Sequence, residues 1–147
     1  MITEDYVSFE TAKLLKEKGF DEATHQFYKV ITYLGTEANS ICIKSLDGIE
    51  DEPFHNSVYG VDLNGEDTGE YACPTLQMVM KWLRVVYNLE IYPYHNSPNN
   101  RHNSEWWFEI IKYPNSVAEY ESGFDEEVDT YEKACETAIK YCLENLI

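Results

Sequence analysis

The sequence predicts an α+β fold in which three helices pack with two antiparallel hairpins, in the order α-β-β-loop-α-β-β-α. Three segments repeat apolar residues at helical spacing, and two pairs of adjacent segments alternate apolar and polar residues. Adjacent strands joined by a turn pair antiparallel, which distinguishes this order from a parallel α/β sheet. A length of 147 residues with 44% hydrophobic residues predicts a single domain over 1-147, with an acidic loop or excursion at 47-73.

The first helix is predicted from Phe9 to about Lys18. Ser8 precedes it and has a side chain suited to an N-terminal cap. Gly19 follows the last helical residue, where a left-handed glycine commonly ends a helix. In such an ending Phe20 contacts Leu15, so we expect these two side chains to be packed together.

The first hairpin is predicted from alternating residues that are rich in aromatic and β-branched side chains. Its strands are His25–Leu34 and Ser40–Leu46, with Gly35–Asn39 as the turn. Between 47 and 73 no period is visible, although the dipeptide Asn64-Gly65 favours a small hairpin turn.

The central helix is predicted over Thr75–Tyr87 and has an unusually wide apolar arc. Its main stripe contains Leu76, Val79, Met80, Leu83, Val86 and Tyr87. A second stripe beside it contains Met78, Trp82 and Val85. We expect this second stripe to be buried, either inside the monomer or at a homodimer contact through helix 75-88.

The rest of the chain predicts a second hairpin with a polar connection, a short strand and a last helix. In the second arm of the hairpin, Trp106, Phe108 and Ile110 point to one side and the alternate residues to the other. The last helix is capped by Asp129 or Thr130. The predicted ranges are Leu89–Tyr94 and Glu105–Tyr113 for the hairpin, Val117–Glu121 for the short strand and Tyr131–Leu146 for the helix.

Charge restricts the classes of partner. Eleven Lys and Arg against 27 Asp and Glu give a net charge of −16, so the average field repels phosphate and makes nucleic acid an unlikely partner. The acid excess is concentrated at 47–70 and 119–136. Two interpretations fit these blocks. Either they imitate the phosphate charge of nucleic acid and so bind a basic protein, or they only keep the protein soluble.

The sequence contains no bilayer-length apolar stretch, and its start lacks the features of a signal peptide. The four cysteines form no C-x-x-C pair, which favours reduced, buried thiols. We therefore expect a cytoplasmic protein with no membrane contact.

Three stretches resemble a known family: Ser8–Phe20, Pro74–Arg84 and Tyr131–Glu144. They are similar to an uncharacterised family of small proteins from gut anaerobic bacteria and their phages and other mobile elements. The stretches coincide with the three predicted helices. The resemblance implies a shared scaffold and a phage-associated context, and because that family has no assigned function it implies no catalytic residues.

One candidate binding surface combines the second hairpin with the central helix. Aromatic rings beside cations are suited to stacked bases and phosphates, and also to protein partners. The alternative is a set of core aromatics beside a solvated turn. The candidate residues are Trp82, Arg84, Tyr92, Tyr94, His95, Arg101, His102, Trp106 and Trp107.

Two groups of side chains contain metal-ligating atoms, and ordinary solvation is the alternative for both. His95 and His102 flank one turn, but their spacing matches no zinc pattern. The loop 62–70 offers carboxylate oxygens, but it departs from the EF-hand pattern. We expect no metal and no cofactor, and no nucleophile or phosphate-loop motif is present in the sequence.

These observations favour a non-enzymatic acidic module that binds a basic protein or serves as an accessory. The alternatives are a binder of single-stranded nucleic acid or a small ligand through the aromatic hairpin 89-113, and a hydrolase without a visible motif.

Overall fold

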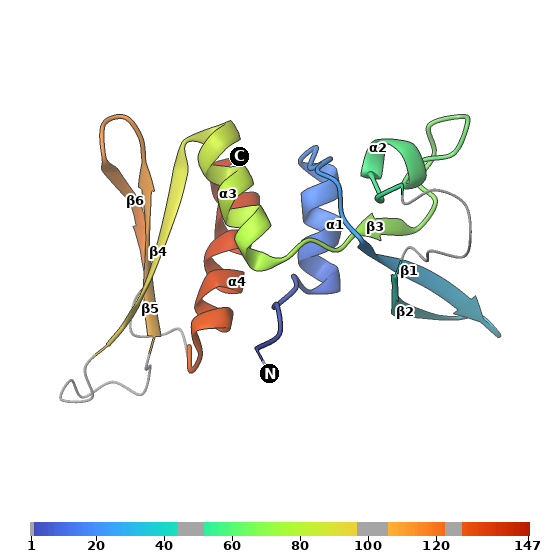
Figure 1. Cartoon of the computed structure of the whole chain (residues 1–147), viewed down its shortest axis with the longest axis horizontal. Helices are drawn as coiled ribbons and strands as arrows, with labels where there is room; N and C mark the ends of the chain where they lie inside the picture. The colour runs from blue at the N-terminus through green and yellow to red at the C-terminus, as the bar shows by residue number, and fades with distance from the viewer. Residues whose placement is uncertain (1, 44–51, 97–105, 123–127) are drawn as a thin grey trace. The chain divides into compact units, whose positions relative to one another are not determined.

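The computed structural model describes residues 2–43, 52–96, 106–122 and 128–147 (Figure 1). It confirms the α+β class, with helices and two antiparallel sheets. The chain divides into two compact units. We call Tyr6–Pro74 the N-terminal unit, and Thr75–Ile147 together with Met1–Asp5 the C-terminal unit. The expectation that the whole chain is one domain stays a prediction.

The N-terminal unit is built on a three-stranded antiparallel sheet in the order β2-β1-β3. Helix α1 packs beside it, with the Phe9 ring edge-on to Tyr28 and Tyr71 at 5.5 and 5.6 Å between ring centres. The elements are α1 (Phe9–Glu17), β1 (Gln26–Tyr33), β2 (Thr36–Ile43), α2 (Asn56–Tyr59) and β3 (Glu70–Ala72).

Both ends of α1 form as predicted. The Ser8 side chain accepts a hydrogen bond from the Thr11 N–H. At the other end Gly19 has φ +81°, and the Phe20 N–H donates to the Leu15 carbonyl at 2.9 Å. Phe20 and Leu15 are fully buried, and the predicted contact between their side chains stays a prediction.

The turn of the first hairpin differs from the prediction. It is the dipeptide Leu34-Gly35, with φ +48° and +79°, joining Tyr33 directly to Thr36. The strand β2 therefore begins before the predicted start at Ser40. The difference arises because leucine rarely adopts positive φ, so Leu34 gave no turn signal.

The segment after residue 51 is ordered around a buried asparagine. Asn56 donates from Nδ2 to the Phe20 carbonyl at 2.8 Å and accepts at Oδ1 from the Ala72 N–H at 2.9 Å. These bonds hold α2 beside β3, and neither element was predicted because both are too short to show a period. The small hairpin predicted at Asn64-Gly65 forms, because Val61 and Asp67 pair in an antiparallel bridge and the Asp62 N–H donates to the Glu66 carbonyl at 2.8 Å. Its turn is longer than two residues, and only Gly65 has positive φ.

In the C-terminal unit the strands form a second antiparallel sheet in the order β4-β5-β6, and α3 and α4 lie on one of its faces (Figure 1). This arrangement matches the predicted hairpin, short strand and helices within a few residues. The elements are α3 (Leu76–Tyr87), β4 (Leu89–His95), β5 (Trp106–Lys112), β6 (Val117–Glu121), α4 (Tyr131–Tyr141) and the π-helical turn Cys142–Leu146. Thr130 is the cap of α4, as one of the two predicted candidates.

The wide apolar arc of α3 is only partly buried. Trp82 is buried, with 7% exposure, and packs edge-on against Tyr87. Val85 of the second stripe and Val86 of the main stripe are 68% and 52% exposed. These valines are not buried inside the monomer, because the helix uses only part of the arc to contact β4 and α4. The homodimer contact through this helix stays a prediction.

Two further expectations concern thiols and membranes. Cys73, Cys135 and Cys142 are buried and free. Within the described ranges, every helix is too short or too polar to pass through a bilayer.

Candidate functional site

The candidate site is the face of the sheet β4-β5-β6 that lies opposite α3 and α4, which we call the outer face. Strand alternation and register decide which residues point to it. Ile91, Phe108 and Ile110 are buried on the helix side, so their neighbours in sequence point outward. The outer face consists of Glu90, Tyr92, Tyr94, Trp107, Glu109, Ile111, Tyr113 and Glu121.

Aromatic side chains form the middle of the outer face. Tyr94 and Trp107 are register partners, and their ring centres lie 6.4 Å apart. Tyr92 and Tyr113 share a hydrogen bond of 2.5 Å between their hydroxyl groups. This bond raises the pKa of Tyr92 to about 12, so the Tyr92 hydroxyl stays protonated at neutral pH.

Carboxylates accompany these rings. Glu109 on β5 and Glu121 on β6 lie directly opposite each other in the register. The Tyr94 hydroxyl donates to Glu121 Oε1 at 3.2 Å, and burial together with this bond raises the pKa of Tyr94. Arg84 on α3 forms an ion pair with Glu90, with 3.0 Å between the charged atoms. The described carboxylates of the outer face, those of Glu90, Glu109 and Glu121, outnumber this cation, so the net charge of the surface is negative.

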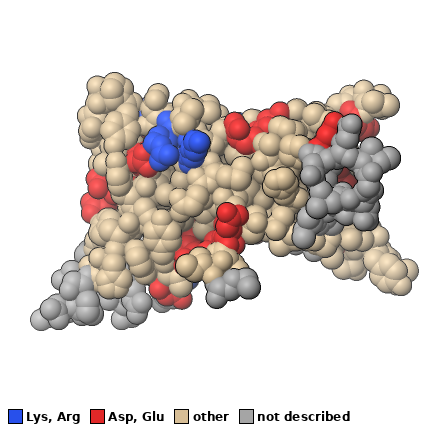
Figure 2. Space-filling model, in the orientation of Figure 1, with Lys and Arg blue, Asp and Glu red and all other residues tan. Residues whose placement is uncertain are grey.

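Acidic groups are also spread beyond the outer face. Figure 2 shows one side of the molecule, on which red acidic side chains occur in several separate places and blue basic side chains gather in one. A mobile cation approaching this side therefore meets carboxylates at many points.

The predicted nine-residue surface is divided by the structure. Arg84, Tyr92, Tyr94 and Trp107 lie at or beside the outer face, as the preceding contacts show. Trp82 is buried on α3, and strand alternation places His95 and Trp106 on the helix side, so these three do not share the outer face. Their role in binding stays a prediction. The Trp106 ring packs edge-on against His95 and Tyr131, both at 5.4 Å. Strand alternation separates Trp106 from Trp107, and Arg101 and His102 lie outside the described residues.

Five members of the outer face were not among the predicted residues because they carry no motif. They are Glu90, Glu109, Ile111, Tyr113 and Glu121. Alternation along the strand predicts that Tyr113 and Glu109 lie on the same side as Trp107, so the sequence did contain a signal for these two residues. Glu121 becomes visible only through its register with β5.

Carboxylates of the loop 62–70 hold the loop together and join it to neighbouring elements of the N-terminal unit. Asp62 Oδ1 accepts from the N–H groups of Asn64 and Glu66 at 2.7 and 2.9 Å, which lowers the pKa of Asp62. Glu70 pairs with Lys29 of β1 at 3.4 Å. Among the described residues no group of three His, Cys, Asp or Glu is placed to hold a metal ion. The reading of the acidic blocks as a charge mimic stays a prediction.

No protein-family model, curated protein or solved structure matches this chain. The resemblance to the family from gut anaerobes and their mobile elements therefore stays a prediction, and the function is argued from the geometry.

Proposed function

We propose that the chain is a non-enzymatic binding module of the cytoplasm, and that its outer face binds a basic segment of a protein partner. One observation carries the proposal: Glu109 and Glu121 lie opposite each other across β5 and β6, beside the rings of Tyr94 and Trp107.

Like charges directly opposite on paired strands destabilise a sheet. A cationic side chain of the partner between Glu109 and Glu121 would remove this repulsion and gain two charge-assisted hydrogen bonds. The same arrangement repels a phosphate group, which is why we favour a protein over nucleic acid.

The aromatic rings suit the same partner. An arginine or lysine over the face of Tyr or Trp gains about 0.5–1 kcal/mol at an exposed site. Tyr92, Tyr94 and Tyr113 are 42%, 36% and 38% exposed, so part of each side chain is accessible. Tyr, Trp and Arg also dominate the energetics of protein interfaces.

The test is titration of the ¹⁵N-labelled protein with a synthetic peptide of alternating arginine and glycine. We expect shifts in the amides of β5 and β6 and in the Trp107 indole, and binding that weakens as salt rises. Glu109→Gln and Glu121→Gln should each weaken binding roughly fivefold. The same variants should melt at an equal or higher temperature, because each removes the cross-strand repulsion.

The matched control is Glu144→Gln, which removes an exposed carboxylate from the C-terminal helical turn. It should leave peptide binding unchanged. The proposal fails if the Glu109 and Glu121 variants bind like the control, or if a peptide of alternating glutamate and glycine shifts the same resonances.

A further inference from the structure

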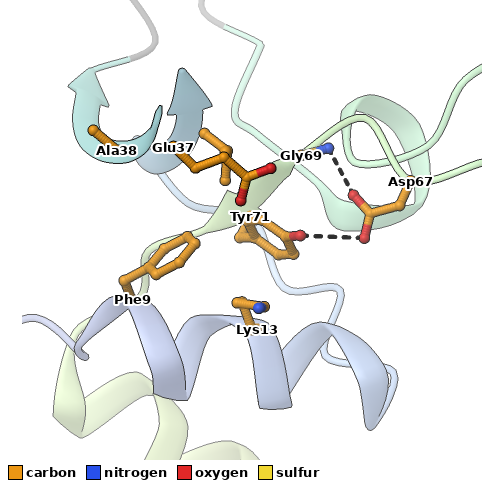
Figure 3. Close-up of a pocket in the computed structure, with 8 residues that line it drawn as sticks. Phe9, Lys13, Glu37, Ala38, Asp67, Gly69 and Tyr71 are labelled. Atoms are coloured by element: carbon orange, nitrogen blue, oxygen red, sulfur yellow. Dashed lines mark hydrogen bonds between the residues drawn. The ribbon is translucent and has the colours of Figure 1, made fainter. Parts of the chain in front are cut away.

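The N-terminal unit contains a hollow of about 450 Å³ that the proposed function does not use. It lies between α1, the β1–β2 hairpin and the loop that leads into β3 (Figure 3). Its volume falls in the range of roughly 300–1,000 Å³ that is typical of small-molecule pockets. The lining residues are Phe9, Lys13, Val30, Glu37, Ala38, Asp67, Gly69 and Tyr71.

The aromatic wall of the hollow is held in place. Tyr71 is 9% exposed, its ring lies edge-on to Phe9, and its hydroxyl donates to Asp67 Oδ2 at 3.3 Å. The Lys16 ammonium lies 4.5 Å from the centre of the Tyr71 ring. These contacts fix the wall before any ligand arrives, which reduces the entropy lost on binding.

The charges of the lining are not all compensated. Asp67 is paired with Lys16 at 3.0 Å and also accepts from the Gly69 N–H at 2.6 Å. Lys13 and Glu37 are exposed, and within the described part of the chain neither has an ion-pair partner. One cation and one anion thus remain at the hollow.

The two remaining charges come from different walls. Lys13 projects from α1, where its ammonium lies 5.6 Å from the centre of the Phe9 ring. Glu37 projects from β2, and Figure 3 shows its carboxylate and the Lys13 side chain on either side of the Tyr71 ring. A ligand that satisfies both must carry one charge of each sign, with an apolar part between or beside them.

We propose that this hollow binds a small zwitterion, a free amino acid or short peptide with an apolar or aromatic side chain. The ammonium group of the ligand pairs with Glu37, its carboxylate pairs with Lys13, and its side chain packs on Phe9 and Tyr71. A purely cationic ligand is opposed by Lys13, and a purely anionic one by Glu37 and Asp67.

The probes are phenylalanine and the dipeptide glycyl-phenylalanine, each added to ¹⁵N-labelled protein at millimolar concentrations. We expect at least one of them to shift the amide resonances of Ala38, Gly69 and Tyr71. Acetylating the amine of that probe, or converting its carboxylate to the amide, should weaken binding about fivefold in each case.

Two variants test the roles of the Glu37 carboxylate and the Lys13 ammonium separately. Glu37→Gln should remove the preference for the free amine, and Lys13→Gln should remove the preference for the free carboxylate. The matched controls are Glu22→Gln and Lys81→Gln, which change exposed charges outside the lining and should keep both preferences. The proposal is overturned if no probe shifts these resonances, if the blocked probes bind as well as the free ones, or if the controls act like the variants.

Discussion

The ammonium of Lys16 on α1 lies 3.0 Å from Oδ1 of Asp67, in the loop that precedes β3. The same ammonium donates to the carbonyl oxygens of Gly60 and Glu70, at 2.6 and 3.1 Å. Its side chain is only 12% exposed. One lysine therefore joins α1 to three points of a segment more than forty residues later in the chain.

We predict that Lys16→Met destabilises the N-terminal unit by about 2 kcal/mol. The substitution keeps the apolar stem but removes one hydrogen-bond donor from each of two carbonyl oxygens and a carboxylate. Urea unfolding followed by circular dichroism measures the change. Lys13→Met, on the exposed side of the same helix, should cost less than about 0.5 kcal/mol, and an equal effect of the two variants would contradict the prediction.

Stability should decrease in acid partly because of Asp67. The Gly69 N–H and the Lys16 ammonium lower the pKa of this carboxyl, against the opposing effect of burial. Because the folded-state pKa is depressed, its stabilisation is complete above the unfolded pKa and is lost as pH falls through the folded pKa. In the Asp67→Asn variant the free energy of unfolding should depend less steeply on pH below about pH 4. If the free energy of unfolding decreases in acid equally in the variant and in the parent protein, Asp67 does not contribute to this decrease.

Gly60 should not tolerate a methyl group, although its own φ of −78° is ordinary. A Cβ there would lie 2.6 Å from the Asn56 carbonyl oxygen and 3.0 Å from Lys16 Nζ. We expect Gly60→Ala to cost more than Gly65→Ala, whose Cβ meets open space and whose penalty of about 1 kcal/mol comes from φ +81° alone. Chemical denaturation of the two variants provides the comparison, and the reverse order would refute the steric argument.

Leu34→Asn should stabilise the first hairpin. Leu34 has φ +48° and is 88% exposed, so it has the backbone penalty of a left-handed residue and little burial in return. Asparagine before glycine is the preferred pair for this turn. Calorimetry should show that the free energy of unfolding increases by about 0.5–1 kcal/mol. A decrease would mean that the leucine makes a contact that asparagine cannot replace.

The buried thiols should resist modification. Burial raises the pKa of Cys135 to about 11 and that of Cys142 to about 12, so both remain protonated at neutral pH. In a Cys42→Ser background, Ellman's reagent should react at the rate at which the protein unfolds. Fast reaction under native conditions would place one of the thiols at an accessible position.

The sequence was sufficient to predict the helices whose apolar residues repeat over two or more turns. It was also sufficient for the strands whose side chains alternate over several residues. The cap at Ser8 and the ending at Gly19 could be predicted because local hydrogen bonding determines them. The short elements α2 and β3 could not, because Asn56 fixes them through bonds to Phe20 and Ala72, far away in sequence.

The candidate site was predictable only in part, for a related reason. Alternation separates Trp106 from Trp107 in the sequence itself, but the candidate surface contained both because it was assembled by composition. The opposition of Glu109 and Glu121 depends on the register of β6, which is irregular beside Ile110 and Ile111. No periodicity within one strand contains that information.

All three tryptophans, Trp82, Trp106 and Trp107, belong to the C-terminal unit, and the N-terminal unit contains none. Intrinsic indole fluorescence therefore reports the melting of only one of the two units. If its midpoint coincides with that of the far-ultraviolet signal, the units unfold cooperatively. If the midpoints differ, a tryptophan placed in the N-terminal unit, for example Tyr33→Trp at the 74% exposed end of β1, would make the other transition visible.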